Sequence, residues 1–235
     1  MTKAQKLLND NGVIRWTALV LIALMMFFAY MFVDVLSPLS TLLETSKGWS
    51  AETYGTFCSS EYFLNVFAFF LIFAGIILDK MGIRFTGILS GAVMVIGASI
   101  KLYAISDFFT PDSGLYRFLD SFWTSFPATA KLASVGFMIF GCGVEMAGVT
   151  VSKAIAKWFK GKEMALAMGL EMAIARLGVF AVFRLSPYLS TWVNETMPTV
   201  VTPVLFCTIL LVIGLITYTV FTFMDVKLDK QLGES

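Results

Sequence analysis

The sequence predicts an all-α, polytopic membrane protein, and two observations lead to this prediction. Of the 235 residues, 58% are hydrophobic and only 14% are charged, and the mean hydropathy is +0.82. Soluble domains carry a charge on about a quarter of their residues. In addition, the chain contains six apolar stretches, each close to the roughly 20 residues that a helix needs to cross the hydrocarbon core of a bilayer.

The six predicted spans follow one another along the chain, with glycine, proline and polar residues at their ends. They cover 13–35, 54–78, 85–105, 132–151, 164–186 and 203–224. A polar N-terminal segment, 1–12, precedes them, and a polar tail, 225–235, follows them. In the longest connection, apolar residues recur at helical spacing behind Pro111 and Asp112. This pattern predicts an interfacial amphipathic helix, or alternatively an extension of the fourth span.

Lysine and arginine are concentrated in every second connection between the predicted spans. Such residues in short loops stay on the cytoplasmic side of a membrane. We therefore expect both termini in the cytoplasm, and we expect the chain in a bacterial inner (plasma) membrane. The basic residues concerned are Lys3, Lys6, Arg15, Lys80, Arg84, Lys153, Lys157, Lys160, Lys162, Lys227 and Lys230.

Composition argues against several classes of function. The net charge of +1 gives no basis for nucleic-acid binding. The absence of histidine excludes histidine-based acid–base catalysis and most zinc sites. Cys58, Cys142 and Cys207 are scattered through apolar segments, where cysteine usually fills the core. We find no pairing of a nucleophile with a base, so we expect neither an enzyme nor a metal or cofactor site.

Ionisable residues within the predicted spans point to transport. A charge costs a few kcal/mol or more in hydrocarbon, so such residues persist mainly where they line a polar cavity. Glu145 and Arg176 both fall near the middle of the membrane at about 1.5 Å of helix per residue. The full set is Asp34, Glu61, Glu145, Glu171, Arg176 and Arg184.

The connection between the second and third spans carries a recognisable motif. Its order, Gly-x-x-x-Asp-(Arg/Lys)-x-Gly-x-Arg, resembles the signature of the major facilitator superfamily, although Ile83 stands where that family often has a second basic residue. The resemblance implies that the carboxylate and the basic residues help to close a cytoplasmic gate. Physically, the same residues would also make a well-capped turn. They are Gly75, Asp79, Lys80, Gly82 and Arg84.

The fourth and fifth spans are similar to a branch of this superfamily that transports dipeptides. The resemblance implies that Glu145 contacts a peptide amine and Arg176 a peptide carboxylate. Glu171 departs from the pattern, because a neutral amide is expected there, and this departure implies a difference in ion coupling. The matching stretches are 141–145, 157–163, 168–170 and 175–178.

The resemblance implies the six-helix N-terminal bundle of a major facilitator fold, built as two inverted three-helix repeats. The tail after residue 224 resembles the start of a central cytoplasmic linker. We therefore expect either a fragment of a twelve-helix protein or a half-transporter that pairs with a second copy. In both cases the partners are the lipid bilayer, a second six-helix half and a small-molecule substrate.

The function we expect is secondary transport of a small dipolar solute, most readily a short peptide, by alternating access. Alternatives are a proton-coupled transporter of an organic anion or other metabolite, and a non-transporting membrane subunit. Glu145 and Arg176 either bind substrate or form a structural ion pair. Asp34 and Arg184 either pair near the outer surface or reach water. Glu61 and Glu171 either carry protons, because burial favours a neutral carboxyl, or simply line the cavity.

Overall fold

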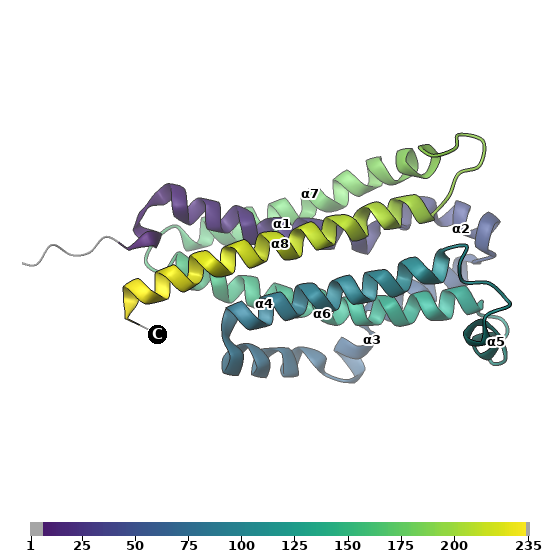
Figure 1. Ribbon diagram of the computed structural model, residues 1–235, viewed down its shortest axis with the longest axis horizontal. Coiled ribbons are helices and arrows are strands. Elements are labelled where there is room, and N and C mark those ends of the chain that lie inside the picture. The colour runs from purple at the N-terminus through teal and green to yellow at the C-terminus, as the bar shows by residue number, and fades with distance from the viewer. Residues whose placement is uncertain (1–6, 234–235) are drawn as a thin grey trace, which may run out of the picture.

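The computed structural model describes residues 7–233, and within them every regular element is a helix. Long helices run side by side along the longest axis of the molecule (Figure 1). The elements are η1 (Leu8–Asp10), α1 (Gly12–Asp34), η2 (Ser37–Leu39), α2 (Ser40–Lys47), α3 (Ala51–Phe67), α4 (Phe70–Ile105), α5 (Gly114–Asp120), α6 (Ala128–Trp158), α7 (Met164–Thr191) and α8 (Val201–Leu232).

Local sequence accounts for where several helices begin and end. The side chain of Asn11 accepts a hydrogen bond from Val13 N–H and caps α1. The hydroxyl of Ser50 does the same for Thr53 N–H at the start of α3. Gly48 and Gly233 end α2 and α8 in the left-handed conformation that glycine adopts without a steric penalty.

The second predicted span differs in the structure from a single continuous helix. Helix α3 ends at Phe67, and the chain breaks at Ala68 and Phe69 before α4 begins. Phe69 adopts a φ of 51°, which is uncommon for a residue other than glycine. Phe67, Ala68 and Phe69, at the break itself, are exposed. The second piece runs to Gly82, where a φ of 75° and a ψ of 174° reverse the chain into the third predicted span.

Five helical segments in the described part of the chain are long and apolar enough to cross a membrane. With 17 residues, α3 is not one of them. Other spans are longer than the sequence suggests: α6 starts at Ala128 and ends at Trp158, and α8 continues to Leu232 through much of the expected tail. In the connection before α6, α5 is a helix of only 7 residues.

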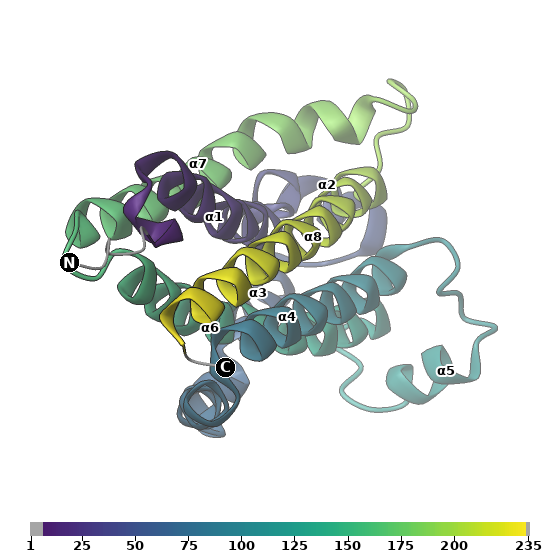
Figure 2. The ribbon, with the colours of Figure 1, turned by 60° about the vertical axis from the view of Figure 1, so that its left-hand side comes forward.

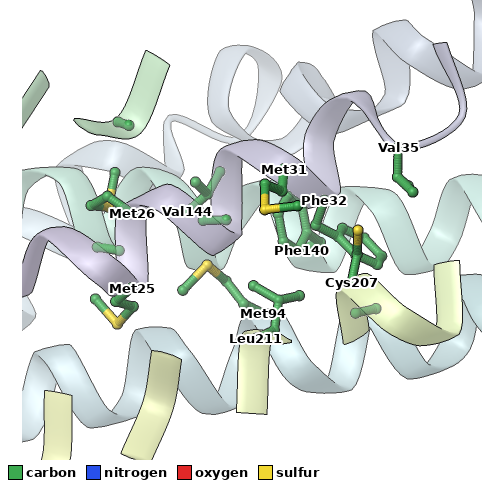
Figure 3. Packing of buried hydrophobic residues seen from close by; sticks show 14 of the residues in the cluster. Met25, Met26, Met31, Phe32, Val35, Met94, Phe140, Val144, Cys207 and Leu211 are labelled. Atoms are coloured by element: carbon green, nitrogen blue, oxygen red, sulfur yellow. The ribbon is translucent and has the colours of Figure 1, made fainter. Parts of the chain in front are cut away.

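Small residues allow α4 and α6 to pack closely. A side chain on Gly97 would collide with the backbone of Gly136 and Phe140, and one on Gly136 would collide with the backbone of α4. Such close approach is the usual way in which membrane helices associate. Helix α1 also contributes to the buried core, through Met25, Met26, Met31 and Phe32 (Figure 3).

Different elements of the chain lie at the two ends of the bundle. One end, here called the terminal end, holds the start of α1, the α6–α7 turn and the last turn of α8, while α2 and α5 lie at the other (Figures 1 and 2). At the terminal end, Leu8 N–H donates to the side chain of Gln231 at 2.8 Å. Arg15 donates to the Asn9 carbonyl at 2.8 Å and pairs with Glu163 at 2.9 Å. Lys3 and Lys6 lie outside the described residues.

Candidate functional site

Four of the six ionisable residues singled out from the sequence line one cavity between α1, α3, α6 and α7. This cavity has a volume of about 290 Å³, and its charged lining consists of Asp34, Glu61, Glu145 and Arg176. A second cavity of about 220 Å³ shares Met26, Tyr30, Gly148 and Arg176 with the first and adds Glu171. The two cavities therefore meet along α1, α6 and α7, with Arg176 in the wall of both.

Arg176 and Glu145 face the first cavity without pairing with each other. Among the described residues, neither takes part in an ion pair within 4.0 Å. The guanidinium of Arg176 lies 5.1 Å from the centroid of the Tyr30 ring on α1, as expected for a cation–π contact. The cavity wall thus carries side chains of opposite charge, which suits a solute that carries both charges.

Glu61 is the most deeply buried carboxylate of the cavity. Its residue is 5% exposed. A side chain on Gly141 would collide with the backbone carbonyl oxygen of Glu61, so α3 and α6 are in direct backbone contact at this level. Glu61 interacts electrostatically with Glu145 and Asp34, which have the same sign, and with Lys101, which has the opposite sign.

Asp34 and Arg184 are in separate surroundings. Asp34 accepts a hydrogen bond of 3.0 Å from the Ser37 hydroxyl, and Tyr54 donates to Ser37 at 3.2 Å. Arg184 is exposed on α7, lines neither cavity and makes no ion pair within residues 7–233. The structure therefore brings Asp34 to the cavity and leaves Arg184 outside it. Glu171 is buried on α7 and faces the second cavity.

The predicted gating motif lies at the turn that Gly82 makes at the terminal end of the bundle. Asp79 pairs with Lys153 of α6 at 2.7 Å, on an exposed surface. Arg84 pairs with two carboxylates of α8, at 2.6 Å to Asp229 and 3.4 Å to Asp225. Lys80 is exposed, and a side chain on Gly75 would meet nothing within 4 Å. The motif therefore connects α4 to both α6 and α8.

Asp225 is the buried centre of this network, and sequence analysis missed its role. Its side chain is fully buried. It accepts hydrogen bonds from Lys157 at 3.0 Å and from the Trp158 indole at 2.9 Å. Asp229, one turn further, also pairs with Lys157, at 2.6 Å. The spacing of four residues between the two aspartates was the available signal, because it places both on one face of a helix.

Other contributors to the site were missed because their residue types are common in membrane helices. Tyr30 and Tyr62 line the first cavity, although nothing in the sequence distinguishes them from the other aromatic residues of the first two spans. Lys101 is completely buried near the end of α4. Within the described part of the chain, no cluster of three or more histidine, cysteine or acidic residues could hold a metal ion.

Comparison with known proteins places these features in a family. The family model described as Major Facilitator Superfamily matches residues 22–234. A protein named lysosomal dipeptide transporter MFSD1 is 30% identical over 107 residues in both Bos taurus and Homo sapiens, which is 45% of this chain and 19% of that protein. The Danio rerio protein of the same name is 45% identical over 47 residues, covering 20% of this chain and 10% of its own length. The matched stretches thus span a fifth or less of these relatives.

Proposed function

This chain belongs to the Major Facilitator Superfamily, and we propose that it moves small dipolar solutes, above all short peptides, across a membrane by alternating access. Membership makes it an integral, multi-pass protein of a lipid bilayer and points to transport rather than catalysis. The peptide assignment is a proposal. It draws support from the relatives named as dipeptide transporters, which match part of this chain.

The observation that carries the proposal is the placement of Glu145 and Arg176 in the wall of one cavity without a bond between them. A guanidinium offers a bidentate fork to a carboxylate, and a carboxylate receives an ammonium group. A short peptide carries one of each at its two ends. The cavity volume of about 290 Å³ is close to the lower end of the roughly 300–1,000 Å³ typical of ligand pockets, which favours a small solute.

The proposed architecture is a six-helix bundle of two inverted three-helix repeats. Its second span would consist of α3 and the part of α4 before Gly82. Alternating access requires a second six-helix bundle against which this one rocks, supplied by further chain or by a second copy. Asp79 and Arg84 would then help to close the gate at the terminal end. Asp79→Asn should change transport rate with little effect on substrate binding from the opposite side.

The proposed orientation places the terminal end in the cytoplasm, because most basic residues of the connections lie there. A bacterial inner membrane remains our proposal for its location. A reporter fused after Ser235 that works only in the cytoplasm should be active, and activity of an exclusively extracytoplasmic reporter would overturn the orientation.

Substitution of Arg176 tests the proposed function directly. Arg176→Lys retains the positive charge and removes the bidentate fork, so we expect at least about a tenfold loss of dipeptide affinity, about 1.4 kcal/mol. The measurement is uptake of labelled dipeptides by cells that express this chain in its complete reading frame, supported by equilibrium binding to the purified protein. Arg184→Lys is the matched control on the same helix, because Arg184 lines neither cavity.

Three results separate the possibilities. A loss confined to Arg176→Lys supports the proposal. Equal affinities in the wild type and Arg176→Lys, with a lower melting temperature for the variant, would assign Arg176 a structural role. Failure of the wild type to bind or move any dipeptide would exclude peptides as substrates.

A further inference from the structure

Lys101 is a fully buried cation that lies among aromatic rings. It is 0% exposed, and its ammonium nitrogen has no hydrogen-bond partner among the described residues. Three ring centroids surround this nitrogen, at 4.4 Å for Phe32, 5.1 Å for Phe57 and 4.3 Å for Phe137. A buried ammonium normally needs a partner, and here the faces of the rings provide the only stabilising contacts of this kind that the described residues show.

The three rings, here called the aromatic cage, come from three different helices around α4. Phe32 belongs to α1, Phe57 to α3 and Phe137 to α6. Phe57 and Phe137 stack with their centroids 4.8 Å apart and their planes 11° apart. Ring faces carry partial negative charge and attract cations. The cage therefore fits a charged lysine better than a neutral apolar side chain.

The aromatic cage lies one helical turn from the buried carboxylate of the cavity. Glu61 follows Phe57 by four residues on α3, and Gly141 follows Phe137 by four residues on α6. Since Gly141 contacts the Glu61 backbone, the cage and Glu61 occupy neighbouring layers of the same α3–α6 interface. The fold therefore brings the Lys101 ammonium and the Glu61 carboxyl into neighbouring layers of one interface.

Other ionisable groups also influence the charges of Lys101 and Glu61. Around Lys101 these are Asp34 from α1, Cys58 from α3 and Cys207 from α8. Around Glu61 they are Asp34 from α1, Tyr62 from α3 and Glu145 from α6, with Arg176 of α7 in the same cavity wall. Without Lys101, three carboxylates would face a single guanidinium in this cavity.

We propose that Lys101 is a positioning residue for Glu61: its caged charge favours the ionised form of Glu61 in the cavity wall, against the effect of burial, and so helps to set the pH at which Glu61 takes up a proton. The inference rests on the proposed function in one respect only, which is that protonation of Glu61 affects transport. The electrostatic pairing itself can be measured without a substrate. Lys101 would then determine the pH dependence of transport without touching the solute.

The test is an infrared pH titration of the purified protein, following the carbonyl stretch of protonated carboxylic acids. Glu61→Gln identifies the band that belongs to Glu61. Lys101→Met removes the charge with a flexible side chain whose sulfur still makes favourable contacts with aromatic rings, and Lys101→Gln is a second neutral variant. We expect the midpoint of the Glu61 band to move to higher pH by about one unit or more, the usual effect of losing a neighbouring opposite charge.

Two controls separate this effect from a general loss of structure. Lys101→Arg keeps the charge and should leave the midpoint close to that of the wild type. Lys131→Met removes another buried lysine, whose ammonium contacts the Phe122 ring and the carbonyls of Leu119 and Phe122. Because Lys131 is not among the groups that act on Glu61, its substitution should leave the midpoint unchanged.

The inference is overturned if the neutral Lys101 variants titrate like the wild type, or if Glu61→Gln removes no band in any of them. The readout needs no substrate, so a negative result here differs from failure of the peptide assignment. If the wild type transports dipeptides, the acid limb of its pH profile should shift in Lys101→Met in the same direction as the infrared midpoint.

Discussion

The backbone carbonyl of Glu61 packs against Gly141 so closely that a methyl group on Gly141 would overlap it. This contact sets the distance between α3 and α6 at the level of the cavity. Because the overlapping atom belongs to the backbone, a side-chain rotation cannot relieve the collision. The position of the Glu61 carboxylate therefore depends on the absence of a side chain at residue 141.

We predict that Gly141→Ala destabilises the bundle and displaces Glu61. Overpacking of this kind typically costs about 1–3 kcal/mol. Thermal unfolding in detergent measures the loss. Gly148→Ala on the same helix is the control, since a side chain there would meet nothing within 4 Å, and alanine is favoured over glycine within a helix by up to about 1 kcal/mol. Equal melting temperatures for the two variants would contradict the packing argument.

Replacing Glu145 should discriminate between peptides with and without a free amine. In Glu145→Gln, the proposed partner of the peptide ammonium loses its charge, so the affinity for a free dipeptide should fall by at least about tenfold. The affinity for its N-acetylated form should change much less. Competition binding with the two peptides measures both, and Glu195→Gln in the exposed α7–α8 connection is the control. A similar loss for both peptides would show that Glu145 does not recognise the amine.

The ion pairs at the terminal end should differ in how much they contribute to the stability of the protein. Asp225→Asn removes the fully buried charge of this network and leaves Asp229 as the remaining carboxylate partner of Arg84 and Lys157, for which we expect a loss of roughly 3 kcal/mol. Asp79→Asn breaks an exposed pair with Lys153 and should cost less than about 1 kcal/mol. Chemical denaturation of both variants gives the comparison. If Asp79→Asn were the more damaging, the buried position of Asp225 would not be the source of its stability.

Acid should weaken the contact between Arg15 and Glu163. A backbone hydrogen bond, helped by the Arg15 guanidinium, lowers the pKa of the Glu163 carboxyl. A lowered pKa in the folded protein means that the contribution is complete above the ordinary glutamate pKa of about 4.3 and is lost as pH falls through the folded value.

Melting temperatures measured from neutral pH into this acid range should therefore converge for the wild type and Glu163→Gln. The wild type should have the higher value only at the neutral end. Glu195→Gln, an exposed glutamate with no ion pair among the described residues, should follow the wild type throughout. A difference between wild type and Glu163→Gln that persists at the lowest pH would contradict the prediction.

The sequence was sufficient for the helical class and the family, because both depend on signals within short stretches. Apolar runs of membrane length predicted the helices, and the motif from Gly75 to Arg84 indicated the superfamily, which the family match confirms. Counting 1.5 Å per residue placed Glu145 and Arg176 at a similar depth, and they do line one cavity. Their roles in binding remain predictions.

What the sequence could not supply depends on three-dimensional packing. An isolated lysine near a helix end looks the same whether it reaches water or, like Lys101, lies between aromatic rings of three other helices. Asp225 looked like part of a polar tail because apolar character ends before it, yet α8 continues and buries it against Trp158. The break at Phe69 carries no glycine or proline, so residue type gave no warning of it.

The hydrogen bond from Leu8 to Gln231 joins residues 223 positions apart. A contact between such distant parts of a chain cannot form until synthesis has reached the second of them. During co-translational insertion, the start of α1 must therefore wait for α8 to arrive before the terminal end can close. The sequence separation of this one bond makes it a marker that α1 and α8 have met, formed after the helices between its two ends have emerged from the ribosome.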